Sequence, residues 1–357
     1  KYQSEWGPDM IKKGFIGIYI LITLLGCKQT IPDQVDLLFQ AYQNDSPGAA
    51  VMVIHKGEIM LERHYGLANI EQKTEVSSTT NFRLASVTKQ FTAMAILQLM
   101  DSNRLTFSTG LKDVFPEFPD YANSINYGQL LHHTSGLINY EDLIPDSATI
   151  PVRDADILTI LIAQDSTYFP PGSAYHYSNG GYVLLALTVE RLSGLSFPDY
   201  LEQYIFAPTG MTGSVAYVNG TNNISNRALG YNIVNNGTEF SDHSMTSSVL
   251  GDGGIYSSVS DLYKWDQALY KFELLSEAWL DSAYTPWLKN YGCGWRIEDY
   301  KGLKRISHTG GTCGFRTDYM RFPESEFSVI VLTNRREPGV QYLAEALTDI
   351  YLLSEND

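Results

Sequence analysis

The sequence predicts an α+β fold, with one antiparallel sheet built from both ends of the chain, flanked by helices, and a mostly helical insertion between its two halves. Runs rich in Val, Ile, Met and aromatic residues, typical of strands, fill 48–69 and recur between 291 and 334. From about 106 to 250 the pattern is instead helical, with long polar loops between the helices. Strands grouped at both ends with helices grouped between them favour this arrangement over alternating α/β units.

The strands are separated by recognisable turns. In 48–69 the Lys56-Gly57 turn joins two apolar runs, which predicts a hairpin. Toward the C-terminus four strand-like runs follow one another, YGCGWRI, LKRISHTGG, TDYMRFP and FSVIVLTN. We expect the first two of these to pair as a second hairpin.

The helices are marked by apolar spacing and by their ends. A strongly apolar helix is predicted at 86–105, where residues at i, i+3, i+4 and i+7 are apolar, and it should be largely buried. The helix GGYVLLALTVERLSG ends at Gly194. An amphipathic helix follows the Gly-rich turn of GDGGIYSSVSDLYKWDQALY, and VQYLAEALTDIYLL predicts the last helix.

The composition and the net charge of the chain limit the classes of partner that can be expected. The chain has 357 residues, of which 44% are hydrophobic, and a net charge of -15. Nucleic-acid binding needs a basic face, and no block of Lys and Arg occurs, so we expect no nucleic-acid partner. We expect a soluble catalytic part that is monomeric.

The N-terminal segment resembles a lipoprotein signal. A basic start after Met10 is followed by an apolar run at 15–25, which is shorter than the roughly 20 residues that span a bilayer. Leu24-Leu25-Gly26-Cys27 then resembles the bacterial lipobox. We expect residues 1–27 to be a signal peptide with Cys27 as the lipidated residue, and the protein to be lipid-anchored in a bacterial cell envelope, with its folded part outside the cytoplasm. The alternative is a buried apolar helix with an incidental cysteine.

The strongest chemical signal is Ser86-Val87-Thr88-Lys89. On a helix, residues i and i+3 share a face, so Lys89 can reach the Ser86 hydroxyl, and a Ser–Lys pair can act as nucleophile and base. The alternative is an N-capping serine before a solvated lysine. The pair stands at the head of the most apolar helix, where an exposed pair would not be expected. No GxSxG, HExxH, GxxxxGK[ST] or GxGxxG motif occurs.

A second signal is a Tyr-x-Asn triplet, which occurs four times and therefore decides nothing alone. The triplets begin at Tyr42, Tyr121, Tyr177 and Tyr217. The third signal is SHTGG at 307–311, where a histidine lies beside a Gly-rich turn.

Taken in order, these motifs resemble the serine β-lactamase and penicillin-binding-protein family, on the side of class C β-lactamases and related esterases. The resemblance covers nearly all of the chain after residue 27 and includes SVTK, LLHHTSGL, FPPGSAYHYSNGGYVLL, GDGGIYSS–DLYKW and HTGGTCGF. It favours Tyr177, which follows the Pro171-Gly172 turn and precedes a helix. Tyr121 falls before LLHHTSGL, so we expect no chemical role for it.

The resemblance implies the roles of the site residues. Ser86 attacks a carbonyl, Lys89 and Tyr177 share the proton transfers, and Asn179 binds the substrate. His308, Thr309 and Gly310 lie on the strand that faces the substrate. The backbone N–H groups of Ser86 and Gly311 form the oxyanion hole. No metal or cofactor is needed.

The resemblance also divides the chain. An α/β sheet domain is expected from residues 28–105 and 251–357, a mostly helical subdomain from residues 106–250, and the active site between the two.

His308 bears on the substrate, because most β-lactamases have Lys-Thr-Gly at this place. At neutral pH a histidine is mostly uncharged, which weakens selection for an anionic substrate. This favours a hydrolase of esters or small amides, including D-amino acid peptides. The alternatives are a β-lactamase or D-Ala-D-Ala carboxypeptidase, and a non-catalytic penicillin-binding sensor or scaffold. Arg316 could restore a positive charge, although a surface position on a strand is the simpler expectation.

The remaining histidines and cysteines have weaker signals. His132 and His133 are expected in a structural turn. His176 is expected in a loop without a chemical role, and the alternative is that it contacts the substrate. Cys293 and Cys313 are either small buried residues or a disulfide that braces the strand of His308.

Overall fold

The computed structural model describes residues 30–235 and 237–354, so the predicted lipidation site at Cys27 lies outside the described residues. The chain divides into two compact units, Lys1–Leu38 and Phe39–Asp357. In the first unit, α1 (Ile31–Leu38) follows Thr30, whose hydroxyl bonds to the Asp33 carboxylate at 2.7 Å. Within the described ranges, no helix is long and apolar enough to cross a membrane.

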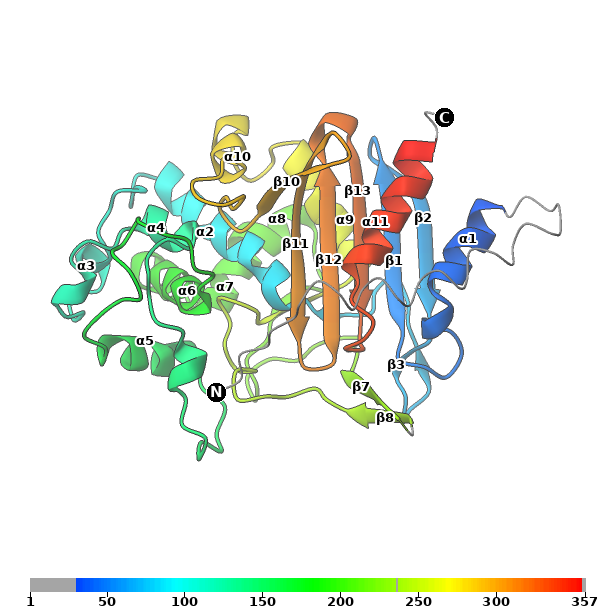
Figure 1. Cartoon of the computed structure of the whole chain (residues 1–357), viewed down its shortest axis with the longest axis horizontal. Coiled ribbons are helices and arrows are strands. Elements are labelled where there is room, and N and C mark those ends of the chain that lie inside the picture. The colour runs from blue at the N-terminus through cyan, green and yellow to red at the C-terminus, as the bar shows by residue number, and fades with distance from the viewer. Residues whose placement is uncertain (1–29, 236, 355–357) are drawn as a thin grey trace, which may run out of the picture. The chain divides into compact units, whose positions relative to one another are not determined.

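The second unit contains the predicted antiparallel sheet, with its six strands in the order β10-β11-β12-β13-β1-β2 (Figure 1). Two strands come from the N-terminal part and four from the C-terminal part, which confirms the predicted architecture. Their bounds are β1 Ala49–His55, β2 Glu58–Tyr65, β10 Arg296–Tyr300, β11 Leu303–Thr312, β12 Phe315–Phe322 and β13 Phe327–Thr333.

The central strands are apolar because both faces of the sheet are covered. Every residue of β13 is buried, as are the first six residues of β1. The helix α11 (Gln341–Thr348) packs against β12 and β13 on the near side of the sheet in Figure 1, and α9 (Val259–Tyr270) packs against β1 and β13 behind it. Burial on two faces explains why these strands have continuous apolar runs and no alternation.

The hairpin of β10 and β11 is shorter than the sequence predicted. Pairing begins at Arg296↔Ser307, so the segment around Cys293 does not lie opposite His308. The chain before Arg296 turns away through Gly294, which has φ +81 and lies against the Lys89 carbonyl, where an added Cβ would come within 2.6 Å. Because of this turn, β11 has no β10 partner beyond Ser307.

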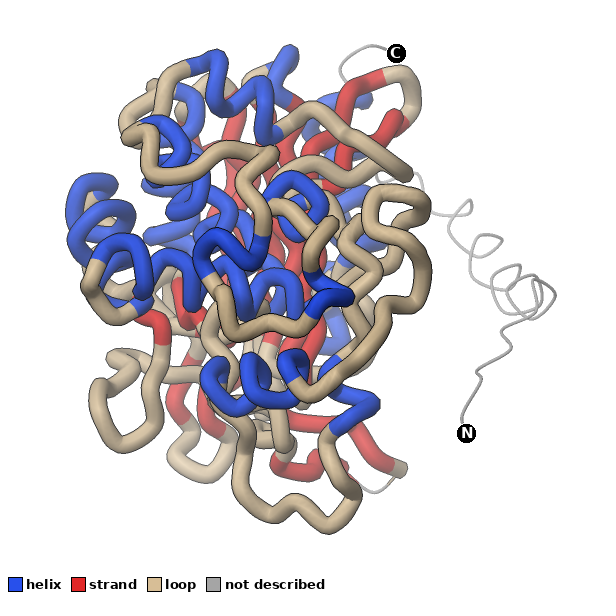
Figure 2. Tube along the Cα trace, turned by 90° about the vertical axis from the view of Figure 1, so that its left-hand side faces the viewer, coloured by secondary structure: helices blue, strands red, loops and turns tan. Residues whose placement is uncertain are grey.

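Helices fill the region beside the sheet, and Figure 2 shows them in front of the strands. Besides α1, α9 and α11 they are α2 Lys89–Asp101, α3 Leu111–Val114, α4 Tyr127–Leu131, α5 Asp154–Ile162, α6 Asn179–Ser193, α7 Phe197–Leu201, α8 Ala207–Thr209 and α10 Glu277–Ala283. Short strands that the sequence did not reveal join them. These are β3 Leu67–Asn69, β4 Thr74–Glu75, β5 Phe82–Arg83, β6 Val215–Ala216, β7 Tyr231–Val234, β8 Gly237–Phe240 and β9 Ile255–Ser257.

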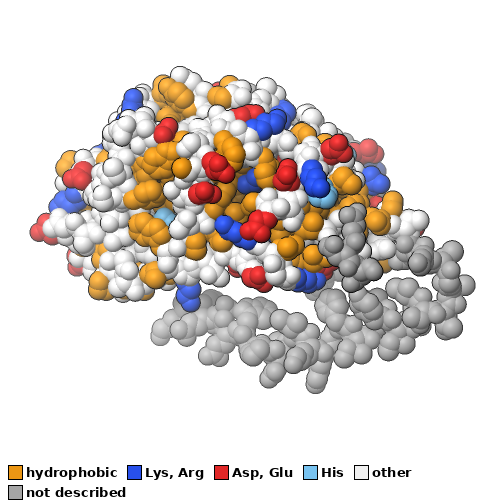
Figure 3. All heavy atoms as spheres, turned by 90° about the horizontal axis from the view of Figure 1, so that it is seen from above, with side chains coloured by type: hydrophobic (Ala, Val, Ile, Leu, Met, Phe, Trp, Pro, Cys, Tyr) orange, Lys and Arg blue, Asp and Glu red, His pale blue; other side chains and the backbone are white. Residues whose placement is uncertain are grey.

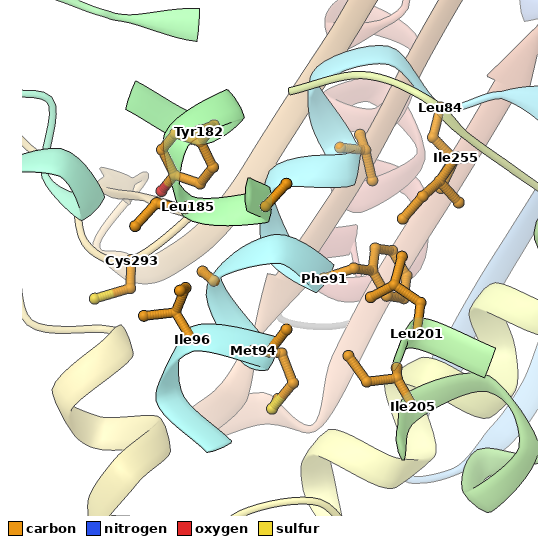
Figure 4. Close-up of a cluster of buried hydrophobic side chains, with 14 of the residues drawn as sticks. Leu84, Phe91, Met94, Ile96, Tyr182, Leu185, Leu201, Ile205, Ile255 and Cys293 are labelled. Carbon is orange, nitrogen blue, oxygen red and sulfur yellow. The ribbon is translucent and has the colours of Figure 1, made fainter. Parts of the chain in front are cut away.

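The predicted apolar helix is α2, and it lies in the middle of the core. Eleven of its residues are buried, including Lys89, which opens it. In Figure 4, Tyr182 and Leu185 of α6 lie on one side of α2, and Leu201 of α7 and Ile205 of the π-helical segment Glu202–Phe206 lie on the other. One difference from the prediction concerns the first turn, since Ala85–Thr88 form a 3-10 turn before the α-helix begins.

The surface fits the charge pattern of the sequence. On the face shown in Figure 3, basic side chains are scattered among acidic and hydrophobic ones, and do not gather into one basic area.

Candidate active site

A pocket of about 100 Å³ opens beside the 3-10 turn that precedes α2. Its walls come from segments far apart in sequence, and Ser86 lies among them with Asn179 and Gly311. The full lining is Arg83, Ala85, Ser86, Tyr140, Glu141, Asn179, Thr246, Asp252, Gly253, Gly311 and Thr312.

The backbone holds Ser86 in this wall through a constrained turn. The preceding residue, Ala85, is buried and has φ +49, in the left-handed region that costs a non-glycine residue energy. The Leu84 amide, one residue earlier, donates to the Ile255 carbonyl at 2.9 Å and ties the turn to β9. The turn therefore fixes the Ser86 hydroxyl at the pocket.

The Lys89 ammonium lies next to this hydroxyl. Its Nζ donates to Ser86 Oγ at 3.2 Å, to Asn179 Oδ1 at 2.7 Å and to the Asp252 carbonyl at 2.8 Å. The side chain is fully buried, and three acceptors match the three N–H donors of an ammonium. The structure thus brings together Ser86, Lys89 and Asn179, as the sequence predicted.

Tyr177 lies beside this group without a hydrogen bond to it. Lys89 Nζ lies 4.9 Å from the centroid of the Tyr177 ring. The Tyr177 hydroxyl is buried and has no hydrogen-bond partner among the described residues. Tyr121, for which we expected no chemical role, lies elsewhere, and its hydroxyl donates to the Leu161 carbonyl at 2.7 Å.

His133, expected only as part of a turn, holds the segment that carries Tyr177. The His133 carbonyl accepts from the His176 amide at 2.9 Å, and His133 Nδ1 accepts from the Ser178 amide at 3.1 Å. These two bonds flank Tyr177 on both sides, and the rings of His133 and Tyr177 lie 4.3 Å apart. Burial holds the pKa of His133 well below its usual value, so the ring is neutral and keeps Nδ1 as an acceptor.

Ser178 and Asn179 start α6. The Ser178 hydroxyl accepts from the Gly181 amide at 3.1 Å, which makes Ser178 the N-cap, and Asn179 is the first helical residue. The Asn179 side chain then connects Lys89 and Glu141, because its Oδ1 accepts from Lys89 and its Nδ2 donates to Glu141 Oε1. Gly194, with φ +77, ends the helix as predicted.

Two carboxylates at the pocket were missed by the sequence analysis. Glu141 Oε2 is buried without a partner among the described residues, and burial raises the pKa of Glu141. Asp252 accepts from the Tyr140 hydroxyl at 2.8 Å, and burial raises the pKa of Asp252 as well. No local motif marks either residue as chemical, since their positions depend on contacts between distant segments.

The position of His308 corrects an expectation. We expected its side chain to meet the substrate, but it is only 1% exposed and both ring nitrogens are occupied. Nδ1 donates to the Thr309 carbonyl at 2.7 Å, and Nε2 accepts from the Tyr291 hydroxyl at 3.0 Å. Burial, reinforced by the charge of Lys89, lowers the pKa of His308 to about 3, so the ring is uncharged.

Strand alternation explains this burial. Residues two apart on β11 point to the same face, and a Cβ at Gly310 would meet the Leu84 carbonyl at 2.1 Å. Gly310 therefore serves close packing of β11 against the Ser86 turn, and His308 points inward with it. Gly311 lines the pocket of Ser86, whereas Thr309 and Gly310 line a neighbouring hollow with Arg316, which Gly311 also borders.

The two cysteines are free, so the disulfide hypothesis is wrong for this structure. Cys293 is buried with its Sγ 3.9 Å from His132 Nε2, and Cys313 is followed by β12 at the other end of β11. His132 donates from Nδ1 to the Gly128 carbonyl at 2.8 Å and stacks on Trp287, which is a structural role. Among the described residues, no group of three His, Cys, Asp or Glu side chains could hold a metal ion.

Comparisons with known proteins agree with this architecture. The family model described as Beta-lactamase matches residues 32–352. Penicillin-binding protein 4* of Bacillus subtilis is 32% identical over 316 residues, covering 80% of this chain and 68% of that protein. A D-aminopeptidase of Brucella ovis is 27% identical over 309 residues, covering 81% of this chain but only 56% of that protein.

Solved structures show the same fold. A penicillin-binding protein from Bacillus halodurans superimposes with a TM-score of 0.77 at 28% identity, covering 91% of this chain and 100% of that one. A D-amino acid amidase from Ochrobactrum anthropi gives a TM-score of 0.75 at 21% identity, covering 90% and 99%, which shows the fold alone. The chain belongs to the beta-lactamase family, whose members with this β-lactamase/transpeptidase-like fold are serine hydrolases and penicillin-binding proteins.

Proposed function

We propose that the protein is a serine acyl hydrolase that forms an acyl-enzyme on Ser86. The observation that carries this proposal is the contact of 3.2 Å between Lys89 Nζ and Ser86 Oγ at the wall of a pocket. A buried cation beside a hydroxyl favours the alkoxide that attacks a carbonyl. Gly311 lines the same pocket, so its backbone N–H and that of Ser86 are the proposed oxyanion donors.

The proposed reaction has two halves. Ser86 Oγ bonds to the carbonyl carbon, and its proton passes to whichever member of the Lys89/Tyr177 pair starts the cycle deprotonated. That group then gives the proton to the leaving alcohol or amine as the bond from the carbonyl carbon to it breaks. Water then attacks the acyl-enzyme, its hydroxyl ends on the acid product, and its proton returns to Ser86. Tyr177 is the proposed proton donor to the leaving group, since its hydroxyl is otherwise unpartnered among the described residues.

The substrates that we propose are esters or small amides, including D-amino acid peptides. The uncharged, buried His308 supports this choice, because it offers no cation to a substrate carboxylate. A relative named D-aminopeptidase supports the amide class. The second candidate is a penicillin-reactive enzyme, either a β-lactamase or a D-Ala-D-Ala carboxypeptidase, which the similarity to penicillin-binding protein 4* favours. The third is a non-catalytic penicillin-binding sensor.

The test is hydrolysis of short-chain p-nitrophenyl esters by the wild-type protein and by Ser86→Ala. We expect Ser86→Ala to lower kcat by about 10³-fold or more. Undiminished turnover in this variant would remove Ser86 as the nucleophile. Rapid turnover of nitrocefin in a parallel assay would support the penicillin-reactive candidate, and a stable penicillin adduct without turnover of any substrate would support the sensor.

We also propose that the protein is lipid-anchored at Cys27 in a bacterial cell envelope, with the catalytic part outside the cytoplasm. The support is the order of basic start, apolar run and Leu-Leu-Gly-Cys in the sequence. Labelling of the full chain with radioactive palmitate in bacteria tests it. Label that survives Cys27→Ala, or no label on the wild type, contradicts the anchor.

A further inference from the structure

We infer that Asp154 is a positioning residue whose carboxylate makes the geometry of Lys89 depend on pH. It acts through the loop 250–253, which presents the Asp252 carbonyl to Lys89. The inference rests on the proposed function, because it concerns the regulation of the proposed Ser86–Lys89 pair. Asp154 does not line the pocket of Ser86 and takes no part in the chemistry itself.

The first step is the contact between Asp154 and this loop. Asp154 is buried in the first turn of α5. Its Oδ2 accepts from the Leu250 amide at 2.9 Å, and its Oδ1 accepts from the Gly251 amide at 3.1 Å. Each oxygen thus serves one amide, and protonation of the carboxyl places a donor on one of the two oxygens. Both bonds are therefore complete only while Asp154 carries its charge.

The second step is the close packing of the loop. The Gly251 carbonyl accepts from the Thr92 hydroxyl at 2.7 Å, and a Cβ at Gly251 would come within 2.5 Å of the Tyr182 carbonyl on α6. Three helices, α2, α5 and α6, therefore contact the backbone of Gly251. Because Asp252 is the next residue, a shift of Gly251 also moves the Asp252 carbonyl.

The third step connects the loop to Lys89. The Asp252 carbonyl is one of the three acceptors of Lys89 Nζ, at 2.8 Å, and Ser86 Oγ is another, at 3.2 Å. Lys89 is fully buried, and a buried ammonium with an unpaired N–H is unfavourable. We therefore expect loss of the Asp252 acceptor to move Nζ away from Ser86.

Burial brings the titration of Asp154 into the neutral pH range. It raises the pKa of Asp154 to about 7, and the two amide bonds oppose part of the rise. The charged and titratable groups on the elements around Asp154 and its loop are Asp252 on the loop, Tyr140, Glu141 and Asp142 on the 3-10 helix Tyr140–Leu143, Tyr182 on α6, Lys89 on α2, Arg83 on β5, and Arg153 and Asp156 beside Asp154 itself. The charge of Asp252 adds to the rise. These groups are unchanged in Asp154→Asn, so their own titrations cancel when that variant is compared with wild type.

The experiment compares kcat for p-nitrophenyl propionate from pH 5.5 to pH 8.5 in wild type, Asp154→Asn and Thr92→Val. Asparagine has the shape of a protonated carboxyl and keeps one acceptor oxygen. Asp154→Asn should therefore lie within about threefold of wild type at pH 5.5 and fall about 10-fold or more below it at pH 8.5. Thr92→Val is the matched control, because it removes an uncharged bond to the same Gly251. Its ratio to wild type should not change with pH.

A second control removes a charge from the same helix turn. Asp156 is exposed, and its carboxylate accepts from the Arg153 amide at 2.9 Å. We expect Asp156→Asn to stay within about threefold of wild type at every pH. A ratio of Asp154→Asn to wild type that is constant from pH 5.5 to pH 8.5 overturns the inference, as does the same pH dependence in Thr92→Val.

The pH dependence of stability separates positioning from a merely structural role. Because the pKa of Asp154 is raised from about 3.9 in the unfolded chain to about 7, wild type loses stability as pH rises toward 7. Asp154→Asn should then gain stability relative to wild type from pH 5.5 to pH 7, by up to about tenfold in the unfolding equilibrium constant per pH unit, while its relative activity falls. Activity and stability that fall together would overturn the positioning role.

A measurement without turnover separates this inference from the proposed function. In Ser86→Ala, NMR follows the amide signals of Leu250 and Gly251 and the Cε signal of Lys89 from pH 5.5 to pH 8.5. We expect all three to share a midpoint near pH 7 and to lose this step in Ser86→Ala/Asp154→Asn. Signals without a common step overturn the inference even if the ester is hydrolysed. Absence of ester turnover in wild type counts against the proposed hydrolase alone.

Discussion

At the scale of single residues, the contacts of Lys89 and Tyr177 bear on how these two groups would share the proposed proton transfers. Lys89 donates to Ser86 and to two other acceptors, so as an ammonium it would have to lose a proton before it could accept one. The Tyr177 hydroxyl has no hydrogen-bond partner among the described residues, and the centroid of its ring lies 4.9 Å from Lys89 Nζ. For the proposed reaction, this arrangement favours Lys89 as the group that would stabilise a Ser86 alkoxide, and Tyr177, once deprotonated, as the group that would carry protons to and from the substrate.

Removing the Tyr177 hydroxyl should therefore reduce catalysis without unfolding the protein. We expect Tyr177→Phe to lower kcat/KM for p-nitrophenyl esters by about 10²- to 10⁴-fold, the usual contribution of a general acid or base. The thermal midpoint should change little, since no hydrogen bond of the hydroxyl is lost. Tyr121→Phe is the control, because Tyr121 begins another Tyr-x-Asn triplet but bonds to Leu161. A larger loss of activity in Tyr121→Phe than in Tyr177→Phe would show that the wrong triplet was chosen.

At the scale of elements, the loop before α6 depends on a contact from the segment after α4. His133 has φ +57 and accepts hydrogen bonds from the residues on each side of Tyr177. The HHTSG segment thus acts as a brace for the loop that carries Tyr177, because His133 supplies a neutral acceptor from an unusual backbone conformation.

This brace predicts opposite results for two substitutions at one position. Asn tolerates the left-handed conformation and places its Oδ1 near the former Nδ1, so His133→Asn should keep kcat within about threefold of wild type. His133→Ala removes the acceptor of the Ser178 amide and leaves that buried donor unpaired. We expect the loop that carries Tyr177 to shift as a result, and kcat to fall by about 10-fold or more, which corresponds to the free energy of a buried donor left unpaired.

A merely structural role would lower activity in every background, so the readout is a double-mutant cycle. In Tyr177→Phe, the further change His133→Ala should cost little, because the group that the brace positions is already gone. Equal losses in both backgrounds would show that His133 acts on stability and not on Tyr177.

The elements also show what local sequence can and cannot predict. The apolar runs of β1 and β13, the end of α6 at Gly194 and the Ser86–Lys89 spacing depend on neighbours in the chain, and each was predicted. The start of β10 was missed, because it depends on how Gly294 packs against α2. Glu141 was missed for the same kind of reason, since its partner Asn179 lies 38 residues away.

At the scale of the whole molecule, the candidate site exists only when the two ends of the chain have come together. Ser86 follows the N-terminal strands, Asn179 and Asp252 come from the middle, and Gly311 lies on a C-terminal strand. The order of these segments could be predicted from a family resemblance, but the burial of His308 could not, because it follows from the packing of β11 against the Ser86 turn.

Packing of the whole sheet also buries an acid whose ionisation should set part of the pH dependence of stability. Asp318 on β12 is fully buried, and both of its carboxyl oxygens lack partners among the described residues. Burial raises the pKa of Asp318 to about 8, above the value of about 3.9 expected in the unfolded chain. Between these two values the folded state binds more protons than the unfolded state, so the free energy of unfolding falls as pH rises through this window.

Asp318→Asn removes this titration and should flatten the dependence. We expect the stability of Asp318→Asn relative to wild type to increase from pH 5 to pH 8, by at most roughly 1.4 kcal/mol per pH unit, as measured by urea unfolding. The exposed Asp281→Asn is the control and should show a constant difference. The amide adds a buried donor, but its cost does not depend on pH, and His132, His133 and His308 titrate alike in all three proteins. The slope of the difference therefore isolates Asp318, and a difference that stays constant from pH 5 to pH 8 would mean that this carboxyl is ionised in the folded protein.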